Sequence, residues 1–148
     1  MQLVSAPRLL KDAKAQKEFE KAYQDFNADF WLPLSPEIWK FFNTFSITEE
    51  QILPLLAFLP RHKFLIPILS EAPEHIRDIF GYETKLSLDL DRDPEGKFEE
   101  LFVVVKTMGS TEEAIDLLGK LDEAWFLKVL PKTRNQLNIT VEIQGKTR

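Results

Sequence analysis

The chain is predicted to fold as an α+β protein, with a helical N-terminal half and a C-terminal half that contains a small sheet. Before Gly81, apolar residues recur every three to four positions, which is the period of an amphipathic helix. After it, the segments 85–90 and 136–143 alternate apolar and polar residues, which is the period of a half-buried strand. At 148 residues the chain is expected to form one domain, with lobes at 1–81 and 82–148.

The helical lobe is predicted to begin with an amphipathic helix at about 8–28, because apolar and charged residues segregate there at helical spacing. A short helix through Phe45 is expected next, since Ser35 is a good N-cap and Pro36 suits the first helical position. The stripe of the first helix consists of Leu9, Ala13, Gln16, Phe19, Tyr23, Phe26 and Phe30.

The rest of this lobe contains closely spaced prolines. Thr48 and Gln51 have the spacing of a capping box, which predicts a helix start. Because each proline lacks an amide donor and disfavours helical geometry before it, 48–81 is expected to form two or three short helices that end at Gly81. These prolines are Pro54, Pro60, Pro67 and Pro73.

The second lobe is predicted to open with strands at 85–91 and 100–106, joined by a turn at 93–96. The run 101–105 is apolar on both faces, which is typical of a central strand covered on both sides. We therefore expect the second strand to lie in the middle of the sheet.

A crossover helix is expected next, because Ser110 and Glu113 form a second capping box, and Gly119 is a candidate for a break in it. With a last strand at 137–143, the β-β-α-β order predicts a three-stranded mixed sheet. The crossover helix is expected on one face and the N-terminal helices on the other. Its predicted buried stripe is Ile115, Leu118, Leu121, Trp125, Phe126 and Val129.

Composition narrows the function. Because the chain has no cysteine, disulfides, thiolate metal sites and cysteine nucleophiles are excluded. It also shows no export signal and no long apolar run, so we expect a soluble cytoplasmic protein without a cofactor. The net charge is −5, and the segment 73–123 carries 14 acidic and 6 basic residues. Such an acidic belt repels nucleic acid, whose binding would depend on the basic tail at 124–148.

Two candidate sites involve charged residues. Carboxylates at alternate positions, namely Asp89, Asp91, Asp93 and Glu95, suit a hard cation, although neither register fits a calcium loop and a solvated hairpin turn is the alternative. Arg61, His62 and Lys63 follow Pro60 at an expected helix start, so they form a candidate anion site to which Arg77 is close in sequence. The alternative there is a basic solvent-exposed face.

Aromatic residues are concentrated at 19–45, which holds nine of the seventeen in the chain. Residues one and two apart on a helix point in different directions, so a single packed face cannot hold all of them. Either the sheet of the same chain or a partner protein is expected to cover the remainder. The candidate partner-binding residues are Trp31, Trp39, Phe41, Phe42 and Phe45.

The second lobe also carries a resemblance. Residues 86–143 include Asp93-Pro94-Glu95, the run 100–105, Ser110-Thr111-Glu112-Glu113-Ala114, and the segments 121–127 and 137–142. In these motifs the chain resembles a group of small bacterial proteins to which no activity is assigned. The resemblance implies the β-β-α-β unit and carries over no catalytic or ligand-binding residue.

Three functions remain open from the sequence. The first is a non-catalytic interaction module of adaptor, antitoxin-like or immunity-like type, which holds a partner protein through the aromatic segment or the acidic belt. The alternative is a metal-dependent or histidine-assisted phosphoesterase that uses the 89–95 carboxylates with His62. The third is a regulatory domain with a small ligand between the helical half and the sheet. The sequence predicts neither the partner nor the oligomeric state.

Overall fold

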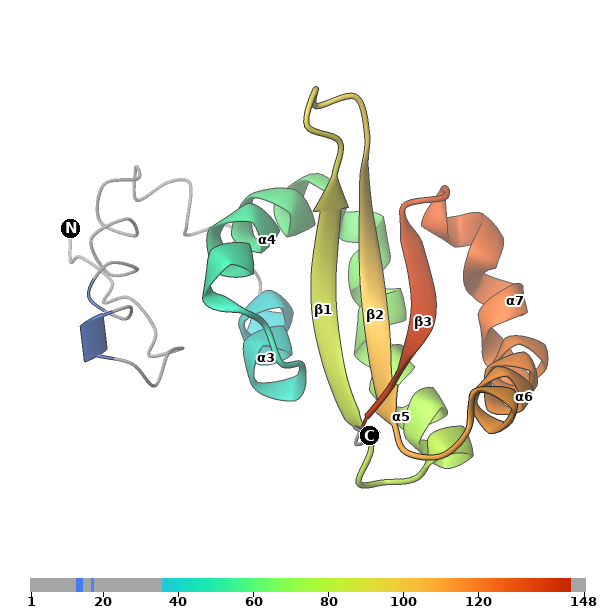
Figure 1. Ribbon diagram of the computed structural model, residues 1–148. Helices are drawn as coiled ribbons and strands as arrows, with labels where there is room; N and C mark the ends of the chain where they lie inside the picture. Colours follow the sequence, from blue (N-terminus) through green and yellow to red (C-terminus); the bar gives the residue numbers. More distant parts are fainter. Residues whose placement is uncertain (1–12, 15–16, 18–35, 145–148) are drawn as a thin grey trace.

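The computed structural model describes residues 13–14, 17 and 36–144 (Figure 1). Residues 13, 14 and 17 are helical and fall inside the predicted 8–28 helix, while the rest of that element lies outside the described residues. The elements in order are α3 (Pro36–Thr44), α4 (Glu49–Arg61), a 3-10 turn (Lys63–Leu65), α5 (Ile66–Phe80), β1 (Lys85–Arg92), β2 (Glu99–Thr107), α6 (Thr111–Leu121), a π-helical turn (Asp122–Phe126), α7 (Leu127–Val129), a 3-10 turn (Leu130–Thr133) and β3 (Leu137–Ile143). The prediction of an α+β fold, with mostly helices first and strands second, is confirmed.

The prolines break the helical lobe less than predicted. Pro54 and Pro60 lie inside α4, and Pro73 lies inside α5, whose first turn holds Pro67. The chain leaves helical geometry between α4 and α5 at His62, after which a single 3-10 turn leads into α5. Burial of the apolar stripes outweighs the roughly 3 kcal/mol that an interior proline costs a helix. These stripes include Ile52, Leu55, Leu56, Phe58 and Leu59 in α4 and Ile66, Ile68, Leu69, Ala72 and Ile76 in α5.

The sheet has the order β1-β2-β3, with β2 antiparallel to β1 and parallel to β3. Val103 lies opposite Leu88 on one side and Ile139 on the other. The predicted mixed sheet with a central second strand is therefore confirmed. The β-β-α-β order is met only in part, because the predicted single crossover helix is divided into α6, the π turn, α7 and a 3-10 turn.

Only one face of this sheet is covered in the described part of the chain. Leu101, Val103 and Val105 of β2 are 0% exposed, whereas Phe102 and Val104 between them are only half-buried. Figure 1 shows α5 behind the sheet, with α3 and α4 beyond one edge and α6 and α7 beyond the other. The expectation of helices on both faces is therefore wrong for the described residues.

The π turn explains how two consecutive aromatic residues are buried together. A π turn inserts an extra residue into the helical register. Trp125 and Phe126 are 5% and 4% exposed, with ring centroids 5.9 Å apart. Gly119 does not break α6, and Ile115, predicted to be buried, is 61% exposed.

The outer edge of β1 is closed by two segments of the helical lobe. The Ser46 N–H donates to the Leu86 carbonyl at 2.8 Å, and the Leu88 N–H donates to the Ser46 carbonyl at 3.1 Å. The Gln51 amide accepts from the Leu90 N–H at 2.6 Å and donates to its carbonyl at 3.3 Å. Thr48 is the N-cap of α4, but the predicted capping-box bond is missing because Gln51 binds β1 instead.

Within the described residues, no single helix has both the length and the apolar character to cross a membrane. In that part of the chain, the two segments 49–61 and 63–80, which meet at a bend of 95°, reach this length and composition only when taken together.

Candidate functional site

The predicted aromatic patch is divided between the core and a groove. Phe41 and Phe45 are 3% and 2% exposed and pack edge to face, with ring centroids 6.1 Å apart. The prediction that these two side chains face a partner is wrong, because they belong to the hydrophobic core. Phe42 is half-buried and lines a groove. Trp31 and the side chain of Trp39 lie outside the described residues.

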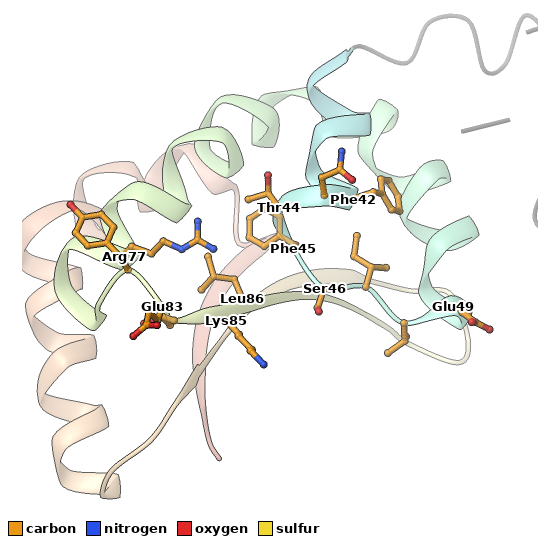
Figure 2. A pocket seen from close by; sticks show the side chains of 14 residues that line it. Phe42, Thr44, Phe45, Ser46, Glu49, Arg77, Glu83, Lys85 and Leu86 are labelled. Carbon is orange, nitrogen blue, oxygen red and sulfur yellow. The ribbon is translucent and has the colours of Figure 1, made fainter. Parts of the chain in front are cut away.

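That groove, about 680 Å³ in volume, lies where the end of α3 meets the loop between α5 and β1 (Figure 2). One wall is 42–49, which contains Phe42 and Phe45, and the other is 82–86 with Arg77. Gly81, at a φ of 114°, ends α5 as predicted and turns the chain into this second wall. At the rim, the Tyr82 hydroxyl donates to Asp78 at 3.0 Å, and this bond raises the pKa of the phenol.

Arg77 is the most unusual side chain of the groove. It is half-buried, and its Nε is buried without a hydrogen-bond partner among the described residues. Figure 2 shows the side chain extending from α5 toward Thr44 and Phe45. A buried N–H group without an acceptor is uncommon in folded proteins, so it is a reason to look for a missing partner.

The second candidate surface is the uncovered face of the sheet, which we call the open face. Phe102 and Val104 lie along its centre, on β2. Around them are mainly polar side chains, and a shallow hollow of about 350 Å³ passes between Val104 and the segment 46–48. The polar side chains of this face are Lys85, Ser87, Asp89 and Asp91 on β1, Glu100 and Lys106 on β2, and Asn138, Thr140 and Glu142 on β3.

The open face is acidic. Asp91 lies directly opposite Glu100, an arrangement of like charges that destabilises a strand pair. Its two lysines, Lys85 and Lys106, lie opposite each other at one end of the face, and Lys106 is already 4.0 Å from Glu142. The acidic belt predicted from the sequence therefore places unneutralised carboxylates beside half-buried apolar side chains.

His62 is a structural residue. Its Nδ1–H donates to the Phe58 carbonyl at 2.8 Å, its Nε2 accepts from the Gln136 amide at 3.0 Å, and its ring stacks on Phe58 at 3.8 Å. The side chain is 9% exposed and lies at the C-terminal end of α4. The predicted anion site at a helix N-terminus is therefore wrong, because Pro60 continues α4 and does not begin a new helix.

The neighbours of His62 diverge from it. Arg61 Nη2 lies 3.3 Å from Glu99, and its Nε donates to the Ala57 carbonyl at 3.0 Å. Lys63 is exposed. Arg61 does share a hollow of about 500 Å³ with Asp93 at the β1–β2 turn, but His62 is not among the residues that line it.

The carboxylates at 89–95 do not converge. In the part of the chain that the structure describes, no three histidine, aspartate or glutamate side chains are close enough to hold a metal ion. Asp89 and Asp91 belong to the open face, the Asp93 carboxylate accepts from the Lys97 N–H at 3.1 Å, and Glu95 lies 3.3 Å from the Lys97 amine. The metal site considered from the sequence is therefore replaced by the solvated turn that was its alternative.

Sequence reasoning missed the open face although a signal for it was present. The run 101–105 alone suggests two covered faces. On the neighbouring strands, however, the residues that share a face with Val104 are the polar Ser87 and Thr140. A second helical layer would have buried those polar groups too, so the alternation of the flanking strands indicates one covered face.

No protein-family model, curated protein or solved structure matches this chain. The resemblance of 86–143 to small bacterial proteins stays a prediction.

Proposed function

We propose that this protein is a non-catalytic interaction module that holds a basic partner protein on the open face of its sheet. The observation that carries the proposal is the half-exposure of Phe102 and Val104 at the centre of a face that no described helix covers. Apolar side chains surrounded by polar ones are typical of protein-binding patches.

The charges of the open face favour a positively charged partner. Asp89, Asp91 and Glu100 are close to one another, and no lysine or arginine of the described chain forms an ion pair with them. Lysine or arginine side chains on a partner would relieve the repulsion between Asp91 and Glu100. Charge complementarity of this kind raises association rates and excludes acidic partners.

A cytoplasmic adaptor, antitoxin-like or immunity-like role is consistent with these properties. Each of these roles needs a compact domain with a recognition surface and no catalytic centre. The phosphoesterase alternative has less support, because both ring nitrogens of His62 are engaged in the core and the 89–95 carboxylates are separated.

Site-specific cross-linking in native cells tests the proposal. A photoreactive phenylalanine analogue is introduced at Val104 on the open face, and at Leu127, a 55% exposed residue of α7, as the matched control. We expect one stoichiometric partner of basic isoelectric point to be captured from position 104 and identified by mass spectrometry. The Asp89→Lys, Asp91→Lys double variant should lose this product.

The control decides between specific and incidental contact. Capture of the same proteins from both positions, or an acidic partner from position 104, would contradict the proposal. A double variant that retains the cross-link at full yield would show that the carboxylates do not contribute.

A further inference from the structure

We propose that the groove between α3 and the α5–β1 loop binds a ligand that carries a carboxylate on an apolar group, and that Arg77 is the residue that receives the carboxylate. This site is centred on Arg77, which is not part of the open face, although Lys85 and the segment 46–48 border both surfaces. The proposal does not depend on the function proposed for the open face.

Among the described cations, Arg77 differs from the others in its lack of a partner for a buried N–H group. Arg61, Lys97, Lys106 and Lys120 each lie within 4.0 Å of a carboxylate, and Arg134 lies over the Phe64 ring at 4.2 Å. Arg77 has neither kind of partner within the described residues, although its Nε is fully buried. The remaining described cations are exposed or nearer the surface, where water solvates them, whereas a guanidinium recessed in a groove gains most from an anion.

The groove combines a cation with apolar side chains. A guanidinium presents a planar set of donors that suits a carboxylate in a two-point contact. The half-buried Phe42 and Ile47 line the same groove and offer apolar contact to the rest of a ligand. The volume of about 680 Å³ falls within the range of roughly 300–1,000 Å³ that small-molecule sites have.

The negative charges around the groove limit the charge that its ligand can carry. α3 and α5 both end at the groove, so the negative ends of two helix dipoles lie near Arg77. Glu49 and Glu83 also line it, and Figure 2 shows the Glu83 side chain pointing away from the guanidinium. A multiply charged phosphate is disfavoured by this field, whereas a single carboxylate in direct contact with Arg77 is compensated locally.

Amide chemical shifts of the isotope-labelled full chain test the site. The probes are N-acetyl-phenylalanine and, as the matched neutral compound, its carboxamide. We expect N-acetyl-phenylalanine to shift the amides of Thr44, Ser46 and Leu86 saturably, and the carboxamide to bind about tenfold more weakly or worse. Equal binding of the two compounds, or no saturable shift with either, would overturn the proposal.

Variants test the role of Arg77. Arg77→Gln removes the charge and should weaken binding of N-acetyl-phenylalanine by about tenfold or more, whereas Lys85→Gln, which removes the other cation of the groove, should change it by less than about threefold. If Arg77→Gln does not fold, Arg77→Lys serves instead, and it should still weaken binding because it loses the planar fork. Equal losses from Arg77→Gln and Lys85→Gln would refute a specific role for Arg77.

Further probes distinguish the source of the carboxylate. A hexapeptide ending in phenylalanine is titrated with a free and with an amidated C-terminus. Tighter binding of the free-acid peptide than of N-acetyl-phenylalanine supports a chain terminus as the ligand, and the reverse order supports a small carboxylic acid. Tighter binding of inorganic phosphate than of every carboxylate would overturn the assignment of the ligand class.

Discussion

The two faces of β2 carry the same kind of side chain but differ in how far those side chains are exposed. Val103 is 0% exposed under the helical layer, and its neighbour Val104 is half-buried on the open face. Both are valines in the same strand with paired neighbours on each side. Whether such a residue belongs to the core or to a surface available for binding therefore depends on whether a helical layer covers it, and not on its hydrophobicity.

Lysine substitutions at the two positions should give the largest contrast. Val103→Lys buries an ammonium group without a partner, which costs several kcal/mol, so we expect the variant to be unfolded at 25 °C. Val104→Lys leaves its amine in water and should lower the free energy of unfolding by less than about 1 kcal/mol. Circular dichroism and urea denaturation measure both, and similar losses would mean that another layer covers the open face.

Removal of His62 extends the comparison to polar groups. His62→Ala leaves the Phe58 carbonyl and the Gln136 amide without a partner and opens a cavity, so we expect a loss of about 3 kcal/mol. The control is His75→Ala. That ring stacks on Trp125 at 4.7 Å but is half-exposed, so its loss should be about 1 kcal/mol. Urea denaturation separates the two, and equal losses would contradict a structural role for His62.

The hydrogen bonds between Gln51 and the outer edge of β1 allow a sharper test of how the helical lobe is attached to the sheet. Gln51→Ala removes both bonds to Leu90 and should cost about 1–2 kcal/mol. It should also speed hydrogen exchange of the Leu90 amide. In the control, Gln144→Ala, the side chain that is lost bonds to Glu142 at the surface, so stability should change by less than about 0.5 kcal/mol. An unchanged exchange rate at Leu90 would contradict the proposed edge closure.

The smallest expected effect is at the start of α6 and depends on pH. The backbone N–H of Ser110, which donates to the Glu113 carboxylate at 3.0 Å, and the nearby Ser110 side chain hold the pKa of this carboxyl below its ordinary value. The stabilisation from this carboxylate is therefore present above its unfolded-state pKa and is lost as the pH falls through the lower folded-state pKa.

Glu113→Gln should lower the urea midpoint slightly at pH 7, and its difference from the unmodified protein should shrink toward pH 3. Glu112→Gln is the control, because Glu112 lies in the same first turn outside the capping box. A Glu113→Gln difference that stays constant with pH would contradict the assignment.

Local signals predicted the elements well. The change of period at Gly81, the hairpin turn that ends at Gly96 and the Ser110–Glu113 capping box are all present in the structure. They depend on contacts between residues close in sequence, which a pattern of residue types records directly.

The candidate sites were less predictable. His62 looked available for chemistry, but its two bonds join it to residues 4 and 74 positions away. Arg77 stood out only as a neighbour in sequence of that histidine, and its unpartnered Nε follows from how α3, α5 and the start of β1 meet. No spacing along the chain encodes such a meeting of three segments.

By itself, therefore, the sequence determined which segments are helices and strands, the acidic character of the chain and the central position of β2, because periodicity, capping and strand order are local or topological. Only the tertiary structure decided that the described helices cover a single face, that Gln51 binds β1 in place of its own helix, and that Arg77 faces a groove. Which layer covers a face depends on competing packing arrangements between distant segments, and their relative free energies are a property of the whole fold.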